Sequence, residues 1–171
     1  MTSENTTQAR EPAVTVLQCQ TQAPPRRILV VEDEPDIRRL NAEVLECSGY
    51  KVDTAEDGIA GWKALHAVSR APDSYDLLIT DHEMPGLTGL ALVKKVRAAR
   101  MALPVIMATG ALPVRDLFTR YPWIQPAAAL VKPYSIEQLL RTVETVLRTV
   151  TGSRKQIAPP PNWPSVDGLQ L

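Results

Sequence analysis

Residues 28–34 read ILVVEDE and residues 77–83 read LLITDHE, so a short apolar run passes directly into acidic side chains at two places in the chain. Two more apolar runs lie at residues 105–107 and 127–131, and a weaker one lies at residues 51–55. Continuous rather than alternating apolar character is typical of strands that are covered on both faces. The sequence therefore predicts the strands of a parallel sheet.

Apolar residues at helical spacing lie between and after these runs. The clearest helical pattern extends from Ile136 to Val150, and Ser135 and Gln138 form a possible capping box at its start. The earlier patterns are weaker, and the first of them is marked by Ile37, Leu40 and Val44. We therefore expect a helix after each strand.

The fourth connection, between residues 110 and 126, is interrupted by glycine and by several prolines. Its apolar residues still fall at helical spacing, so a helix of about two turns fits between the prolines. The whole order alternates strand and helix, which implies an α/β fold with right-handed crossovers and helices on both faces of the sheet. We expect a doubly wound, five-stranded parallel sheet with a short or irregular fourth helix.

The composition excludes several classes of protein. The 171 residues include 19 basic and 19 acidic side chains, and a formal charge of zero argues against nucleic-acid binding through a basic surface. No apolar run approaches the roughly 18 residues of a membrane span, and the first 25 residues do not resemble a secretory signal. The two cysteines, Cys19 and Cys47, are too few for a disulfide framework or a metal cluster. We expect a cytoplasmic protein that binds neither nucleic acid nor membranes.

The periodic segments fall within one domain, which we place at residues 26–150. Residues 1–25 are polar and show no sustained period, so we interpret them as a disordered tail. Residues 151–171 include four prolines between 159 and 164, which are incompatible with a helix and favour an extended path.

Side chains that can bind a ligand or take part in catalysis follow four of the predicted strands. In an open parallel sheet, ligands bind beyond the carboxyl ends of the strands. The residues at these ends are acids, a hydroxyl and a cation, namely Glu32, Asp33, Glu34, Asp81, Glu83, Thr109 and Lys132. Carboxylates gathered at one edge repel one another unless a proton or a cation neutralises them. An oxygen-only set favours a hard ion, and Mg²⁺ is the usual one where a phosphate completes its shell.

A carboxylate in such a site can also act as a nucleophile toward phosphorus and form an aspartyl phosphate. Phosphoryl transfer needs little beyond positioning and charge stabilisation, which a divalent ion, a lysine and a hydroxyl group would supply.

The sequence also resembles a known family. The segments ILVVEDEPDIRRL, DLLITDHEMPGLTGL, LPVIMATG and LVKPYS are similar, in order and spacing, to those of bacterial response-regulator receiver domains. The resemblance covers about residues 27–150 and implies a flavodoxin-like sheet in the order 2-1-3-4-5.

The resemblance also implies a role for each residue at the strand ends. Asp81 matches the phosphoacceptor, and Thr109 matches the hydroxyl that closes onto the phosphoryl group. Lys132 matches the cation that pairs with Asp81 and then with a phosphoryl oxygen. Asp33 matches the acid that binds Mg²⁺ directly, and Glu32 matches its partner, which acts largely through water.

The remaining implied features concern the loops. The backbone carbonyl of Glu83 matches the third protein ligand of Mg²⁺, beside Asp33 and Asp81. The Lys132–Pro133 peptide bond is expected to be cis. The chain departs from the pattern at Ala129, where many receivers carry Tyr or Phe, so a switch that couples Thr109 to an aromatic ring is not expected here.

We expect a single-domain response regulator that accepts a phosphoryl group on Asp81 from a phosphohistidine donor, which is a histidine kinase or a phosphotransfer protein. The receiver catalyses this transfer to itself, so it is a switch rather than a turnover enzyme, and its output passes by contact with an unidentified downstream protein. The alternative is a receiver-shaped interaction module that works without phosphorylation. A Mg²⁺-dependent phosphatase is disfavoured, because such enzymes usually place the nucleophile after the first strand, in a D-x-D arrangement.

Overall fold

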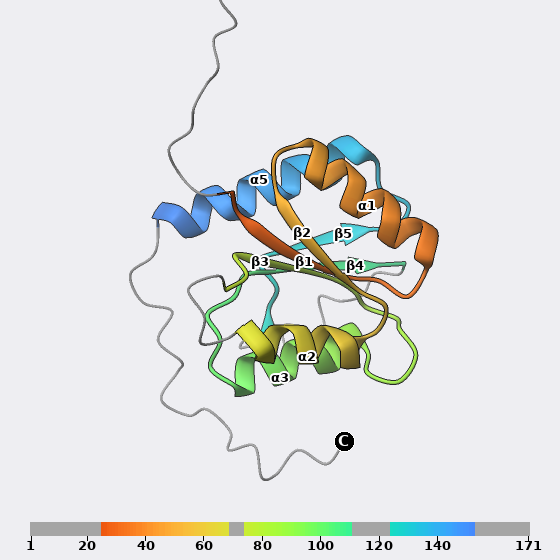
Figure 1. The fold of residues 1–171 in the computed structure, drawn as a ribbon, viewed down its shortest axis with the longest axis vertical. Coiled ribbons are helices and arrows are strands. Elements are labelled where there is room, and N and C mark those ends of the chain that lie inside the picture. The colour runs from red at the N-terminus through yellow and green to blue at the C-terminus, as the bar shows by residue number, and fades with distance from the viewer. Residues whose placement is uncertain (1–24, 69–73, 111–123, 153–171) are drawn as a thin grey trace, which may run out of the picture.

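The computed structural model describes residues 25–68, 74–110 and 124–152. Five parallel strands form one sheet in the order β2-β1-β3-β4-β5, as predicted (Figure 1). The strands are β1 (Arg27–Val31), β2 (Lys51–Ala55), β3 (Leu77–Asp81), β4 (Val105–Thr109) and β5 (Ala128–Val131). The helices are α1 (Pro35–Cys47), α2 (Gly58–Val68), α3 (Gly89–Ala98) and α5 (Ile136–Gly152).

The helices cover both faces of the sheet. Helices α1 and α5 lie on one face, and helices α2 and α3 lie on the other (Figure 1). Alternate residues of the central strands point to opposite faces, so Leu29 and Leu78 join the core beneath α2 and α3, whereas Val30 and Ile79 join the core beneath α1 and α5. All four side chains are at most 2% exposed, which explains the continuously apolar strands in the sequence.

The register of the strands brings their carboxyl ends to one edge of the sheet. Asp81, the last residue of β3, pairs with Ala108 of β4, and Thr109, the last residue of β4, pairs with Val131 of β5. Both β3 and β4 run two residues beyond their predicted apolar runs. Asp81 and Thr109 therefore end their strands instead of following them, and the ladder fixes their backbones.

Two local predictions can be compared directly with the helices. The capping box at the start of α5 is confirmed, because the Ser135 backbone N–H donates to Gln138 Oε1 at 2.7 Å and the Gln138 N–H donates to Ser135 Oγ at 3.2 Å. The first helical pattern is confirmed as α1, but Leu40, one of the apolar residues that mark it, is 49% exposed, whereas Asn41 is 4% exposed.

Some predictions fall on parts of the chain that the structure does not describe. The expected fourth helix lies within residues 111–123, and the expected tails lie within residues 1–24 and 153–171, apart from their inner edges. At the second of these edges, α5 continues to Gly152. Within the described ranges, no helix has both the length and the apolar character needed to cross a membrane.

Candidate functional site

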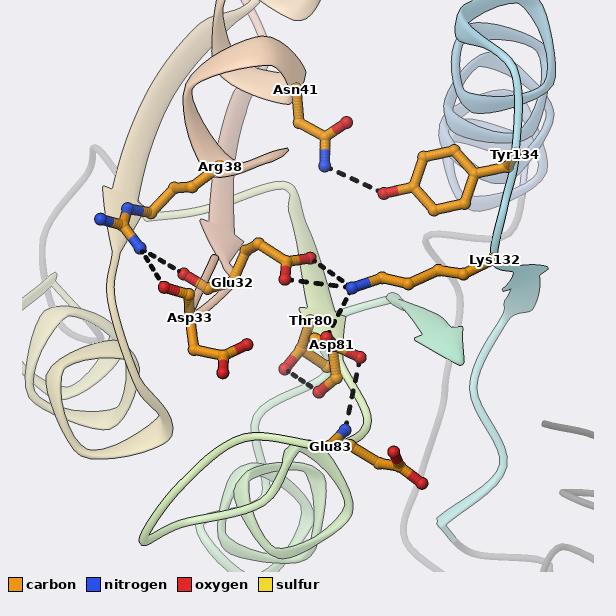
Figure 2. A network of polar contacts seen from close by, with 9 residues as sticks. All are labelled: Glu32, Asp33, Arg38, Asn41, Thr80, Asp81, Glu83, Lys132 and Tyr134. Atoms are coloured by element: carbon orange, nitrogen blue, oxygen red, sulfur yellow. Dashed lines mark hydrogen bonds and ion pairs between the residues drawn. The ribbon is translucent and has the colours of Figure 1, made fainter. Parts of the chain in front are cut away.

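The site centres on Lys132, which follows β5 and extends over the carboxyl ends of β1 and β3 (Figure 2). Its Nζ atom donates to both carboxylate oxygens of Glu32 at 3.0 Å and to Asp81 Oδ2 at 2.6 Å. Side-chain exposure is only 2% for Glu32 and 8% for Asp81. One ammonium group thus compensates two buried carboxylates whose residues lie 51 and 100 positions away in the chain.

Burial and the neighbouring charges shift the pKa values of Glu32 and Lys132. Burial raises the pKa of Glu32 to about 7 despite the hydrogen bond from Lys132, and the negative charge of Asp81 acts in the same direction. Burial alone would lower the pKa of Lys132, but its bonds to Asp81 and Glu32 outweigh that effect and raise it. Lys132 therefore remains a cation, and the Glu32 carboxyl is poorly neutralised by one ammonium group.

Three carboxylates at this edge could hold a metal ion. One oxygen atom each from Glu32, Asp33 and Asp81 can be chosen so that all three lie within 4.8 Å of one another. Their net negative charge exceeds the single positive charge of Lys132, and all three ligand atoms are oxygen. This donor set fits a hard divalent cation such as Mg²⁺.

Arg38 on α1 holds the backbone that carries the first two acids. Its Nη1 atom donates to the carbonyl oxygen of Glu32 at 2.6 Å and to that of Asp33 at 3.1 Å. The guanidinium group therefore restrains the turn between β1 and α1 through backbone carbonyls and not through either carboxylate (Figure 2).

The loop after β3 is positioned by tight backbone packing. A Cβ atom added at Gly89 would lie 1.9 Å from the carbonyl oxygen of Asp81, and one added at Gly58 would lie 2.1 Å from that of Leu87. The Glu83 N–H donates to Asp81 Oδ1 at 3.3 Å. The carboxylate of Glu83 points away from Asp81 (Figure 2), so only the backbone of Glu83 lies beside that side chain.

The last predicted site residue is Thr109, which is 1% exposed at the end of β4. Its carbonyl oxygen accepts the backbone N–H of Lys132 at 2.8 Å, so it lies at the same edge as the acids. The Lys132–Pro133 peptide bond is cis. Ala129 is exposed on β5 and carries no ring, so the structure offers no aromatic side chain at this position.

Sequence reasoning missed two residues that support the site. Arg38 was not singled out, and Asn41 was overlooked in favour of its apolar neighbour Leu40. Asn41 Nδ2 donates to the hydroxyl oxygen of Tyr134 at 3.0 Å, and Tyr134 lies two residues after Lys132 (Figure 2). Their available signals were weak: an arginine and a polar residue on a helix that directly follows a pair of acids.

Comparisons with known proteins agree with this architecture. The family model of the response regulator receiver domain matches residues 28–144. The chain is 32% identical over 129 residues to the chemotaxis protein CheY of Pseudomonas aeruginosa, covering 74% of this chain and 99% of that protein. It is 33% identical over 130 residues to the transcriptional regulatory protein RprY of Bacteroides fragilis, covering 76% of this chain but only about half (52%) of RprY.

A similar solved structure is that of the response regulator TrrA of Thermotoga maritima, in complex with Mg²⁺ and BeF. It is 32% identical, with a TM-score of 0.58, and the match covers 71% of this chain and 98% of TrrA. The protein belongs to the response regulator receiver domain family of two-component systems. Such domains are generally regulatory.

Proposed function

We propose that this receiver accepts a phosphoryl group on Asp81 and thereby changes its contacts with a downstream protein. The observation that carries the proposal is the contact of one ammonium group with two buried carboxylates, while a third lies within reach of the same cation site. The donor would be a phosphohistidine on a histidine kinase or a phosphotransfer protein in the cytoplasm. We place the receiver at residues 26–150, between two tails.

Each residue of the site has a part in this transfer. An oxygen atom of Asp81 attacks phosphorus, a P–O bond forms, and the P–N bond to the donor imidazole breaks, so the imidazole leaves with the bonding electron pair. Lys132 lies against Asp81 Oδ2 and would compensate charge on a phosphoryl oxygen. The hydroxyl of Thr109 would approach the same group from the end of β4.

Asp33 and Asp81, with Glu32 and the backbone carbonyl of Glu83, would hold Mg²⁺. When bound, the ion would neutralise part of the charge of the phosphoryl oxygens. Two observations support this assignment: the three carboxylates that can converge, and the similarity to TrrA, whose structure was determined with Mg²⁺ and BeF.

Labelling with a small phosphodonor tests the proposal. Acetyl phosphate with Mg²⁺ is expected to add one phosphoryl group to the wild-type protein, as detected by intact mass, and chelation of Mg²⁺ is expected to prevent it. Asp81→Asn should stay unlabelled, whereas Asp36→Asn, which alters an exposed acid of α1, should be labelled normally. A wild-type protein that remains unlabelled would overturn the proposal.

The alternative function, an interaction module that does not use phosphate, is favoured by one observation, the absence of a ring at the exposed Ala129. A partner captured by the wild-type protein decides between them. Phosphorylation should change the partner's affinity for the wild type and not for Asp81→Asn. Equal affinities with and without phosphodonor would favour the alternative.

A further inference from the structure

The structure contains a second connection between the helix that follows the acidic turn and the loop that carries the cation. Glu32 and Asp33 lie in the turn between β1 and α1, and Lys132 lies in the loop between β5 and α5. The ion pair of Lys132 with Glu32 joins them at the bottom of the site. Above it, the amide of Asn41 on α1 donates to the Tyr134 hydroxyl of the same loop at 3.0 Å (Figure 2).

The Asn41 side chain that donates this hydrogen bond is buried, so it needs a fixed partner. Asn41 is 4% exposed, and its neighbour one turn further along α1, Leu45, is completely buried in the core. A buried amide without a partner would cost free energy, so the helix keeps its amide directed at Tyr134. The Tyr134 hydroxyl lies beside the contact of Lys132 with Glu32 (Figure 2), and burial raises the pKa of Tyr134 although the hydrogen bond with Asn41 acts in the opposite direction.

The two connections differ in charge: the contact of Lys132 with Glu32 is an ion pair, and the contact of Asn41 with Tyr134 is a hydrogen bond between neutral groups. The bonds of Lys132 to Glu32 and Asp81 would have to rearrange on entry of a cation and a phosphoryl group, because the added charges would compete for the same carboxylate oxygens. The bond between Asn41 and Tyr134 is neutral on both sides, so it does not take part in that competition. It can hold the loop while the ion pairs change.

We propose that Asn41 and Tyr134 are positioning residues, which keep the Lys132 ammonium group over Asp81 while the ion pairs rearrange during phosphoryl transfer. This inference rests on the proposed function of Asp81. It predicts that loss of the neutral bond lowers the rate of phosphorylation without weakening the cation site, because neither residue offers a ligand to the ion.

The test compares Tyr134→Phe, Asn41→Leu and the double variant with the wild type. The rate constant of phosphorylation by acetyl phosphate is expected to fall about three- to tenfold in each single variant, as for loss of one hydrogen bond. The double variant should fall no further than the slower single variant. The dissociation constant of Mg²⁺, measured by calorimetry, should stay within about twofold of the wild type in all of them, since the acids are untouched.

Tyr50→Phe is the matched control. Tyr50 also loses only a hydroxyl group, but it packs against the core beneath α1 and α5, where Glu144 and Arg148 are its charged neighbours. Its variant should be phosphorylated at the wild-type rate. If Tyr134→Phe is phosphorylated at the wild-type rate, the inference is overturned and the role of Asp81 stays intact. The same holds if the variants lose Mg²⁺ affinity by the same factor as they lose rate. An unlabelled wild type would overturn both.

Discussion

Glu32 is the residue at which the cost of building this site is most visible. Its side chain is 2% exposed, and the ammonium group that it contacts is shared with Asp81. Ionising a buried carboxyl group that shares its counter-ion with a second acid is unfavourable, and this raises the pKa of Glu32 to about 7. A divalent cation would relieve it, so the residue that destabilises the metal-free fold also favours cation binding.

The pH dependence of stability follows from this pKa. Between pH 4.5 and about 7, the folded protein keeps a proton on Glu32 that the unfolded chain releases, so ionisation lowers the free energy of unfolding as pH rises through this range. Glu32→Gln does not titrate. Without Mg²⁺, its stability relative to the wild type should therefore increase from pH 5 to pH 8, by an amount on the order of 3 kcal/mol.

Urea unfolding at several pH values measures this difference. Glu43→Gln is the control, because Glu43 is an acid on α1 whose side chain is 64% exposed. Its stability relative to the wild type should change little over the same range. If the difference between Glu32→Gln and the wild type is the same at pH 5 and pH 8, then Glu32 does not carry the raised pKa.

At the scale of elements, α3 depends on the absence of a side chain at its first residue. The Gly89 Cα atom lies so close to β3 that a Cβ atom would be 1.9 Å from the Asp81 carbonyl oxygen, and backbone cannot yield as a flexible side chain would. Gly89→Ala should therefore reduce the free energy of unfolding by about 1–3 kcal/mol.

Gly110→Ala provides the comparison, because a Cβ atom at Gly110 meets nothing within 4 Å. That substitution should be neutral or slightly stabilising, since alanine restricts the unfolded chain. Urea unfolding midpoints of both variants decide the matter. Equal midpoints for Gly89→Ala and the wild type would show that the start of α3 can move away from β3.

The same elements show what the sequence could and could not predict. Continuous apolar runs identified the three central strands and their buried character, because a strand covered on both faces has no polar side to hide the signal. The two edge strands were also placed correctly, but β5 is less buried than its apolar run predicted, since only Leu130 of its four residues is buried. Helix α1 was predicted from the spacing of Ile37, Leu40 and Val44 and is present, but its apolar spacing does not show which side chains are buried: Leu40 is half exposed, and Asn41 is buried. Periodicity cannot show that a polar residue has a partner 93 positions away, and that partner, Tyr134, is what makes burial of Asn41 acceptable.

The candidate site was easier to predict than the helix that supports it. The carboxyl ends of parallel strands lie at one edge of the sheet whatever the side chains are, so the strand order places the acids after β1, the acid that ends β3 and the lysine after β5 at the same edge. The contact of Lys132 with both carboxylate oxygens of Glu32 could not be predicted from the spacing of the motifs. It depends on burial and on the reach of a flexible side chain.

For the whole molecule, the acids at the edge of the sheet couple cation binding to folding. Two of the three carboxylates come from the turn after β1 and the third from the end of β3, so they converge only when the sheet is formed. A cation that binds this arrangement and not the unfolded chain stabilises the protein by mass action.

At ten times its dissociation constant, Mg²⁺ should contribute about 1.4 kcal/mol and raise Tm by a few degrees. Thermal unfolding with MgCl2, against NaCl of equal ionic strength, measures the shift. Asp33→Asn should lose most of this shift. Asp36→Asn, which alters a nearby acid in the first turn of α1 whose side chain is 90% exposed, should keep it. An equal rise of Tm in Asp33→Asn and in the wild type would mean that Mg²⁺ acts elsewhere on the molecule, and that this edge of the sheet does not hold it.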